Sequence, residues 1–589
     1  MSDQWISATA TRNFVFSDPL VDWLNLYGHD KGFKPDTEYE DYDERTDYPK
    51  FIMQKGIEFE SVVISHFEKT CPAYTALRKG ERSFSSVAFD RTRKAIEKGE
   101  PLIYQAVLKD NENLTFGVPD LLIRSDLLRK FFPAAISEEE SLIGAEGCGE
   151  GNYHYRVIDI KFATLSFLKA GDIQASSGST LAYMCQVYIY NRALAAMQGY
   201  RPEGGYLLGR GWSQNKIKGD SFMDRLGFVP DSYVIGKGDP LSSIVDASCQ
   251  WSRRVREEGS EWDVTPDVSV PELRPYMRSK VSYPWNHAKS EINAELQDLT
   301  TLWQVGVPAR KKGNDAGVYR WSDPGVNSSV LGITGPKNPL ILDSLIEINQ
   351  ISGGPEVKPD KIVSANQTWR DYSPVEFFVD FETVSNVNDD FSSAPIKGGQ
   401  TLIFMIGCGH IENGQWEWKS FTVDLLEEDF EADIIDDWLD HMAVVKARLS
   451  DDDFDPIVFH WSPAEKSFLE QAYNSAVVRH PEKSWRRPNW FDFWKEVAKS
   501  EPVLVKGSFG FGLKSMADAL RSHGLIDTSW DSSTTDGLGA MAGAWWVDDT
   551  ARKDGVSMIE IPLMKDIERY NEVDCKVMME IIRYLRENH

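Results

Sequence analysis

A glycine- and proline-rich passage at residues 351–374 divides the chain into two unequal parts. Its sequence, ISGGPEVKPDKIVSANQTWRDYSP, interrupts the apolar periodicity found on both sides, because glycine and proline favour loops and end helices and strands. The chain has 589 residues, more than one hydrophobic core ordinarily holds. The passage therefore predicts a boundary between separately folded units.

Helix-like and strand-like patterns alternate on both sides of this boundary. An amphipathic helix over residues 56–69 is followed by strand-like runs at residues 102–109, 114–124 and 155–163, and then by a second helix over residues 181–198. Beyond the boundary a new strand pattern begins, and the chain ends in a long amphipathic helix. We expect an α/β fold with an α/β domain over 1–235, a mostly helical linking region over 236–355, and a second α/β domain over 375–589.

Composition narrows the class of protein. Hydrophobic residues make up 41% of the chain and aromatic residues 12%, which is typical of a folded protein and not of a disordered one. The N-terminus lacks the pattern of a signal peptide, and no run reaches the roughly 20 apolar residues of a membrane span. We expect a cytoplasmic protein without a membrane partner. The six cysteines form no C-x-x-C pair, so no zinc site, disulfide framework or iron–sulfur cluster is expected.

The net charge of −27 argues at first against a nucleic-acid partner, because phosphate-binding proteins usually carry a basic surface. Net charge, however, bears on solubility and non-specific association and not on what one cleft binds. Local basic clusters occur at residues 253–256, 310–312 and 486–487, and such clusters are most often solvated surface. Charge alone does not identify the partner.

The strand-like stretch RVIDIKFATL, residues 156–165, carries an acid and a base on one face. Asp159 and Lys161 are two residues apart and share a face, while Ile158 and Ile160 occupy the other. A surface ion pair is the simplest interpretation, because D-x-K arises often by chance. A second interpretation is an active site, which requires further polar residues nearby.

Such residues lie on both sides of this strand. Asp120 follows a proline in a predicted neighbouring strand, and Glu60 lies next to the apolar face of the first helix. Gln186 and Tyr190 are four residues apart on the second helix and project from one side. Magnesium and manganese prefer hard oxygen ligands, and a nearby lysine can stabilise developing negative charge.

This set of motifs, in this order, resembles the PD-(D/E)xK nucleases, and more closely their RecB-like branch with a Q-x-x-x-Y helix. The resemblance implies a restriction-endonuclease-like α/β/α core. It implies that Glu60, Asp120 and Asp159 bind the metal and that Lys161 is catalytic. Gln186 and Tyr190 would support the site or contact DNA. The gap between the two aspartates is longer than usual in this branch, and the cysteines of its iron–sulfur members are absent.

A second acidic pattern begins the last domain. In FFVDFETV, Asp380 and Glu382 share one strand face, and a bound cation would relieve the repulsion between them. In the final helix Asp574 falls on the apolar stripe, one turn after Tyr570. A carboxylate in such a position is costly unless it is paired or metal-bound.

D-x-E on a first strand with Y-x-x-x-D on a late helix resembles the DEDD exonucleases of the ribonuclease H-like fold. The resemblance implies that Asp380, Glu382 and Asp574 hold two metal ions, that Tyr570 positions the attacking water, and that cleavage runs 3′→5′. The acid of the second motif has two candidates. Glu465 follows a strand and would be a metal ligand, but it also fits a capping box with Ser462. The competing acid is Asp492.

Most of the chain resembles RecB-like proteins that carry a C-terminal ribonuclease H-like exonuclease domain. We therefore expect a Mg²⁺- or Mn²⁺-dependent nuclease with two centres, acting on single-stranded or end-containing DNA. A helicase would act in trans, because the sequence contains no P-loop. The alternatives are a DNA-binding scaffold with one or both centres inactive, and an exonuclease that trims RNA.

Overall fold

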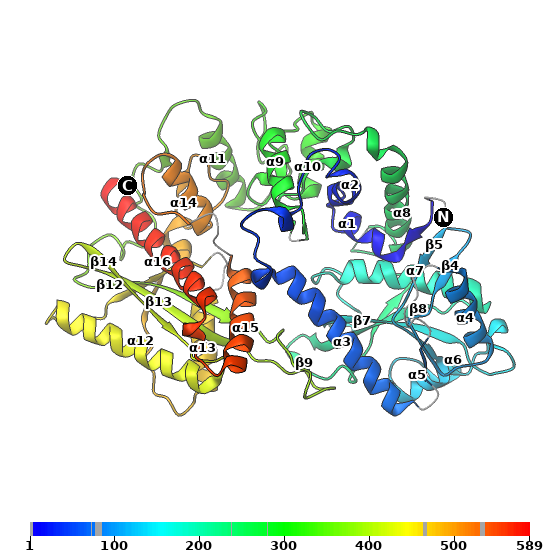
Figure 1. Cartoon of the computed structure of the whole chain (residues 1–589). Coiled ribbons are helices and arrows are strands. Elements are labelled where there is room, and N and C mark those ends of the chain that lie inside the picture. The colour runs from blue at the N-terminus through cyan, green and yellow to red at the C-terminus, as the bar shows by residue number, and fades with distance from the viewer. Residues whose placement is uncertain are drawn as a thin grey trace.

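The structure is a computed structural model that describes residues 4–71, 74–76, 85–236, 238–279, 281–462, 468–530 and 536–589. It is a mixed α/β protein, as the sequence predicts. Figure 1 shows two α/β lobes side by side, the first coloured blue to cyan and the last yellow to red, with green helices lying across their top. The lobes correspond to the N-terminal and C-terminal sequence patterns.

A seven-stranded mixed sheet forms the centre of the first lobe, with strand order β10-β8-β7-β6-β3-β2 and β9 paired to β8. The strands are β2 (Tyr74–Ala76), β3 (Leu102–Tyr104), β6 (Leu121–Arg124), β7 (Tyr155–Phe167), β8 (Gly204–Gln214), β9 (Ile217–Gly219) and β10 (Gly227–Pro230). β7 runs parallel to β8 and antiparallel to β6. Because Leu121 pairs with Ile158, the register places Asp120 beside Asp159.

Two long helices cover the two faces of this sheet. Alternate strand residues point to opposite faces, and they enter separate clusters: Val157 packs with residues of α7 (Thr180–Gln198), whereas Ile158 packs with residues of α3 (Tyr48–Thr70). Both helices lie where the sequence predicts them. The shorter helices of this lobe are α4 (Ser86–Glu97), α5 (Ser125–Phe131) and α6 (Glu138–Ser141).

Two of the predicted strands are each broken in two. Residues 102–109 divide into β3 and β4 (Leu108–Asp110), and residues 114–124 divide into β5 (Thr115–Gly117) and β6. The first break falls at Gln105, whose φ is +52°, and the second includes Pro119, which has no N–H for a sheet hydrogen bond. β4 and β5 form a separate sheet with β1 (Ile6–Ser7). In the main sheet, β6 therefore begins directly after Asp120.

The middle region contains helices, and the N-terminus packs against it. Its helices are α8 (Leu241–Glu258), α9 (Asn286–Leu296), α10 (Val307–Asp315) and α11 (Asn338–Gln350), and the N-terminal helices are α1 (Arg12–Val15) and α2 (Leu20–Tyr27). Trp23 of α2 is buried in one cluster with Trp251 and Trp285. The first residues of the chain therefore share a core with the middle region.

The last lobe contains a five-stranded sheet in the order β14-β13-β12-β15-β16. Its strands are β12 (Glu376–Val384), β13 (Leu402–Glu412), β14 (Gln415–Thr422), β15 (Ile457–His460) and β16 (Asn489–Asp492). β12 pairs antiparallel with β13 and parallel with β15. β11 (Val357–Lys358) and β17 (Leu504–Val505) form a separate two-stranded sheet, which shares a hydrophobic cluster with one face of the five-stranded sheet.

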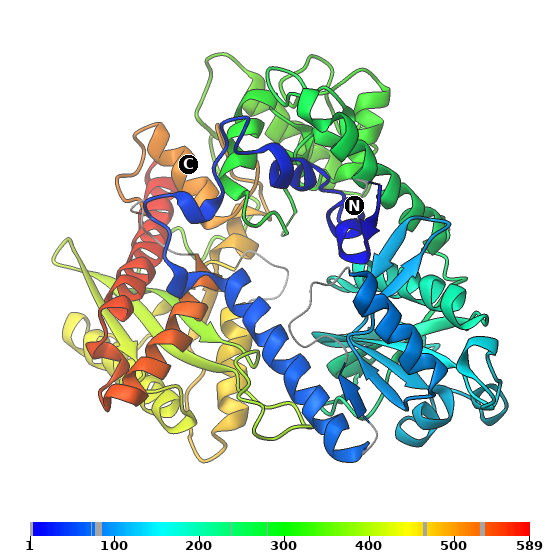
Figure 2. The ribbon, with the colours of Figure 1, turned by 45° about the vertical axis from the view of Figure 1, so that its right-hand side comes forward.

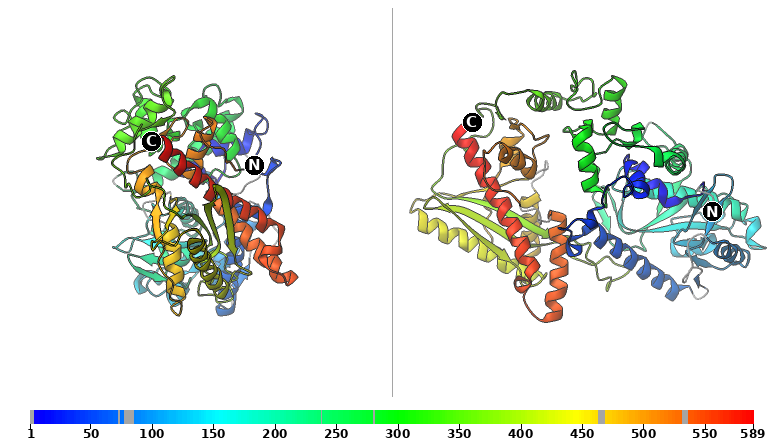
Figure 3. Two further views of the ribbon diagram at one scale, coloured as in Figure 1. Left: turned by 90° about the vertical axis from the view of Figure 1, so that its left-hand side faces the viewer. Right: turned by 45° about the horizontal axis from the view of Figure 1, so that its top comes forward.

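Helices cover both faces of this sheet. The helices are α12 (Glu428–Leu449), α13 (Phe468–Arg479), α14 (Leu513–Ser522), α15 (Gly537–Asp554) and α16 (Pro562–Asn588). Phe377 of β12 packs in one cluster with α12, and its neighbour Phe378 packs in another with the second half of α16. The last helix thus lies along the strand that carries the D-x-E motif (Figure 3).

The two lobes touch through α3 and α15. The rings of Phe51 and Trp545 stack with their centroids 4.4 Å apart, and Figure 2 shows α3 running between the lobes. The loop that joins β12 to β13 makes a second set of contacts with the first lobe. None of the described helices combines the length and apolar composition that a bilayer-spanning segment needs.

Candidate functional sites

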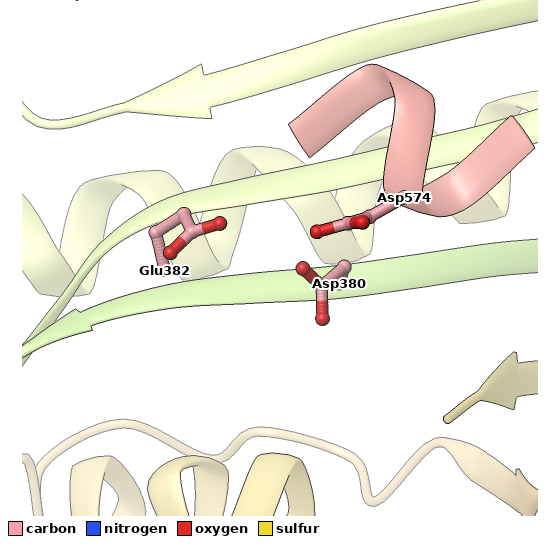
Figure 4. Close-up of side chains that lie close together, drawn as sticks. All are labelled: Asp380, Glu382 and Asp574. Atoms are coloured by element: carbon pink, nitrogen blue, oxygen red, sulfur yellow. The ribbon is translucent and has the colours of Figure 1, made fainter. Parts of the chain in front are cut away.

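Three carboxylates meet between β12 and α16 in the last lobe. Asp380 and Glu382 project from β12, and Asp574 projects toward them from α16 (Figure 4). One carboxylate oxygen from each lies within 4.8 Å of the others. Glu382 and Asp574 are buried, with 6% and 8% of their surface exposed. These three residues are called the triad below.

Burial raises the pKa of all three members of the triad. Burial and the charge of Asp574 raise the pKa of Glu382 to about 8. Burial also raises the pKa of Asp574 to about 6, although the Lys514 ammonium acts against this. Burial and the charges of Asp574 and Glu382 hold the pKa of Asp380 well above its ordinary value. Three carboxylates that repel one another in a buried place form a site in which a cation would be stabilised.

Asn571 connects the two acids of β12. This fully buried residue of α16 donates from Nδ2 to Asp380 Oδ2 at 3.3 Å and to Glu382 Oε1 at 3.4 Å. Gly407 of β13 pairs with Asp380, and a Cβ atom there would lie 1.7 Å from Asn571 Oδ1. The absence of a side chain at Gly407 therefore makes room for the amide.

Aromatic and basic side chains lie next to Asp574 of the triad. Tyr570 hydrogen-bonds to the Asp574 carboxylate, and burial with the nearby acids raises the pKa of its hydroxyl well above the ordinary value. Trp530 Nε1 donates to Asp574 Oδ1 at 3.0 Å. Lys514 Nζ lies 4.7 Å from the centroid of the Tyr570 ring. Tyr570 and Asp574 are thus adjacent, as their spacing predicts.

The donor set of the triad fits a divalent metal ion. All three groups offer hard carboxylate oxygens, which Mg²⁺ and Mn²⁺ prefer. Among the residues that the structure describes, the triad is the one group of three or more acidic, histidine or cysteine side chains close enough together to share an ion. The six cysteines are all free and buried.

The two candidates for the second motif have different outcomes. Glu465 lies outside the described residues. Asp492 ends β16 and is buried, but it is not a member of the triad's cluster. Its Oδ1 accepts hydrogen bonds from the backbone N–H groups of Ser462 at 3.3 Å and Lys495 at 3.2 Å, and burial raises its pKa to about 6. These contacts join the ends of β15 and β16.

In the first lobe the D-x-K pair is a largely buried ion pair and not one on the open surface. Lys161 Nζ lies 2.7 Å from Asp159 Oδ2, and 2% of the Asp159 side chain is exposed. Asp120 Oδ2 accepts a hydrogen bond from the Ile160 N–H at 2.6 Å. Glu60 Oε1 accepts from the Tyr104 hydroxyl at 2.8 Å and from Gln105 Nε2 at 2.9 Å. The helix and both strands therefore bring their polar residues near one another, but Glu60, Asp120 and Asp159 do not lie close enough together to share one ion, as the triad does.

Lys161 balances the charge of this group. Burial and the Asp159 carboxylate raise the pKa of Asp120 well above its ordinary value. Burial by itself would lower the pKa of Lys161, but the carboxylates of Asp159 and Asp120 outweigh it, and the pKa lies above its ordinary value. The lysine is therefore charged at neutral pH.

A cleft of about 770 Å³ opens over these residues. Its floor includes Glu60, Asp120 and Lys161, and its walls come from α2, α3, α7 and α8. Gln186 lines the cleft. Tyr190, one turn further along the same face of α7, is buried, and its ring occupies the space beside Gly117. The structure thus places Gln186 at the site and Tyr190 against the strand that leads to Asp120.

Four residues that surround the triad were not predicted from the sequence: Gly407, Lys514, Trp530 and Asn571. Asn571 could have been identified from the sequence, because it is a polar residue on the apolar side of the last helix. The other three reach the triad from distant parts of the chain, and no spacing rule brings them there.

No protein-family model matches the chain, and no match to it is found among curated proteins.

Proposed function

We propose that the protein is a metal-dependent nuclease with two centres, one in each α/β lobe, and that the C-terminal centre is a 3′→5′ exonuclease. The observation that carries the proposal is the triad, in which three carboxylate oxygens lie within 4.8 Å of one another. The strand order of the last sheet supports the ribonuclease H-like interpretation, because the first three strands are antiparallel and the next two add in parallel beside the first.

Asp380, Glu382 and Asp574 would hold Mg²⁺ or Mn²⁺. A bound divalent ion would supply polarisation of a phosphoryl oxygen and would make water acidic at neutral pH. The protein's own groups have complementary roles. The high pKa of Tyr570 keeps its hydroxyl protonated, so it can orient a water molecule by hydrogen bonding. The nearby Lys514 would attract a phosphate, because it brings positive charge to an acidic site.

In the first lobe, Lys161 is the group suited to stabilising negative charge on a phosphate. It is charged, it lines the cleft, and it lies beside Glu60 and Asp120 on the same floor. Glu60, Asp120 and Asp159 would bind a metal ion together only if their carboxylates moved closer to one another than they lie in the structure. Gln186 on the adjoining wall can hydrogen-bond to a substrate or to the acids.

The cleft of the first lobe favours an unpaired strand as its substrate. Three apolar side chains line it and are well exposed: Leu26 is 50% exposed, Met53 is 62% exposed and Ile57 is 59% exposed. Exposed apolar side chains in a cleft usually mark a binding surface, and unstacked bases offer apolar faces that paired bases do not. A helicase acting in trans would supply such strands from duplex DNA.

The test is digestion of 5′- and 3′-labelled single-stranded DNA, duplex DNA and RNA with Mg²⁺, Mn²⁺ or chelator. Wild type is compared with Lys161→Ala and Asp380→Ala. Metal-dependent products that divide between the two variants, with one activity lost in each, would establish two working centres. Loss in one variant only would leave the other lobe as a binding module. DNA binding without any cleavage by the wild type would refute the proposal, and cleavage of RNA alone would reassign the substrate.

A further inference from the structure

A segment of the C-terminal lobe lies against the centre of the N-terminal lobe. Residues 385–401 join β12 to β13, and they leave the strand that carries Glu382 of the triad. Arg210 of β8 donates to the backbone oxygen of Asn386 at 3.0 Å and to its Oδ1 at 2.5 Å. At the other end, Lys397 Nζ lies 2.8 Å from Asp220. The segment is therefore attached to the first lobe at both ends.

Between these attachments, Phe391 packs on the residues next to Glu60 and Lys161. Its ring centroid lies 5.9 Å from that of Phe59 and 6.0 Å from that of Phe162. Phe59 precedes Glu60 on α3, and Phe162 follows Lys161 on β7. One aromatic side chain from the last lobe thus contacts both elements that form the floor of the cleft.

The backbone that follows Lys161 is irregular. The pairing of β7 with β8 shifts register between Lys161 and Thr164, and a bulged strand lacks part of its regular hydrogen bonding. Phe162 lies within this irregular stretch. Its ring is held by packing, because the Arg210 guanidinium lies 4.8 Å from the ring centroid and Phe391 contacts it as well.

The conformation of Phe391 is itself fixed by several contacts. Its φ of +58° is rare for a residue with a side chain, and such a conformation persists where surrounding contacts determine it. The buried Asp389 carboxylate accepts from the Phe391 N–H at 2.8 Å and from the Gly398 N–H at 2.7 Å. Lys55 of α3 donates to the Asp389 backbone oxygen at 3.0 Å.

We propose that Phe391 is a positioning residue that the C-terminal lobe supplies to the N-terminal centre, where it fixes Lys161 and Glu60 through Phe162 and Phe59. The catalytic part of this inference rests on the proposed nuclease function. Its consequence is that the geometry of the first centre depends on the lobe that contains the second centre.

The test uses the full chain with Asp380→Ala as the parent, so that cleavage reports on the first centre. Phe391→Ala is expected to lower kcat for single-stranded DNA at least tenfold with KM changed less than threefold, because misplaced catalytic groups slow the chemical step. Phe391→Leu keeps an apolar side chain and is expected to retain kcat within threefold. Ile396→Ala is the matched control, because that side chain is in the same segment and 58% exposed.

Hydrogen exchange of residues 156–167 gives a readout that needs no activity. Phe391→Ala is expected to accelerate exchange in this part of β7 at least tenfold, and Ile396→Ala is expected to leave it unchanged. Unchanged exchange in Phe391→Ala, or a kcat within twofold of the parent, overturns the inference. If no variant cleaves DNA but exchange still rises only in Phe391→Ala, the positioning role stands and the nuclease function of the first centre falls.

Discussion

Asn571 of α16 occupies the space that Gly407 of β13 leaves open, so that a Cβ atom on Gly407 would lie 1.7 Å from Asn571 Oδ1. The close approach holds the Asn571 amide against Asp380 and Glu382. Residues that hydrogen-bond to metal ligands without binding the metal themselves orient those ligands and tune the metal affinity of the site. The last helix and the first strand of the lobe are therefore fitted to each other at the triad.

Substitution of Gly407 tests this fit. Gly407→Ala would force Asn571 away from the two acids, and we expect the free energy of unfolding to fall by about 1–3 kcal/mol, as for other overpacked cores. Metal-dependent cleavage by the C-terminal centre should fall with it. Chemical denaturation and exonuclease rates measure the two effects. The control is Gly537→Ala at the start of α15, where a Cβ meets no atom within 4 Å; equal losses in both variants would contradict the account.

Removal of the amide itself should weaken metal binding. The hydrogen bond from Asn571 lowers the pKa of Glu382, so Asn571→Ala should raise that pKa further and let protons compete better with a cation. We expect a roughly 10–100-fold loss of Mn²⁺ affinity at neutral pH, partly recovered at higher pH. Calorimetric titration at two pH values measures this loss. Asn588→Ala on the exposed end of the same helix should bind Mn²⁺ like wild type.

The pKa shifts of the triad predict how pH and metal affect stability. The folded-state pKa values of Glu382 and Asp574 are raised to about 8 and about 6, above those of an unfolded chain. Without metal, the protons bound in the folded state therefore favour folding, and stability falls as pH rises from about 4 through these values. A divalent cation binds the deprotonated form, so its stabilising effect should grow over the same range.

Thermal unfolding with MgCl₂ or chelator at pH 6 and pH 8.5 checks this prediction. The increase in Tm caused by Mg²⁺ should be larger at pH 8.5. In chelator, Asp380→Asn should be more stable than wild type at pH 8.5, because one of the repelling charges is removed. A Mg²⁺ effect that is equal at both pH values, and equal in wild type and Asp380→Asn, would argue that the ion binds elsewhere.

The ion pair of the first lobe predicts coupled stability effects. Lys161→Met would leave Asp159 and Asp120 close together without a counter-charge, and we expect a loss of about 3 kcal/mol in the free energy of unfolding. Asp159→Asn in the same chain should recover most of it. A double-mutant cycle by chemical denaturation measures the coupling. The control is Lys553→Met, whose ion pair with Asp549 is exposed on both sides, and which should lower the free energy of unfolding by less than about 0.5 kcal/mol. Additive effects of the Lys161 and Asp159 substitutions would contradict the burial of this ion pair.

The sequence predicts the parts of these sites that depend on local periodicity. Alternation along a strand places Asp380 and Glu382 on one face, and the helical repeat places Tyr570 one turn before Asp574. Both spacings are fixed by backbone geometry, and both pairs lie together in the structure. The same holds for Asp159 and Lys161 on β7.

Other features depend on how distant segments meet, and local patterns do not encode them. Gln105 interrupts a strand because its backbone turns to a φ of +52° and its side chain donates to Glu60. Lys514 and Trp530 reach the triad from segments 44 or more residues before Asp574. Phe391 belongs to a loop whose partner surface is the other lobe. Each position follows from tertiary packing.

The proposed function depends most directly on the binding of a divalent cation by Asp380, Glu382 and Asp574. Electron paramagnetic resonance of free Mn²⁺ during titration counts the bound ions directly, and the comparison is wild type with Asp574→Asn, both in the Lys161→Ala background at pH 8. The account predicts that Asp574→Asn loses at least one tightly bound Mn²⁺ and the metal-dependent exonuclease activity together. An unchanged number of bound ions, with unchanged affinity, would contradict it.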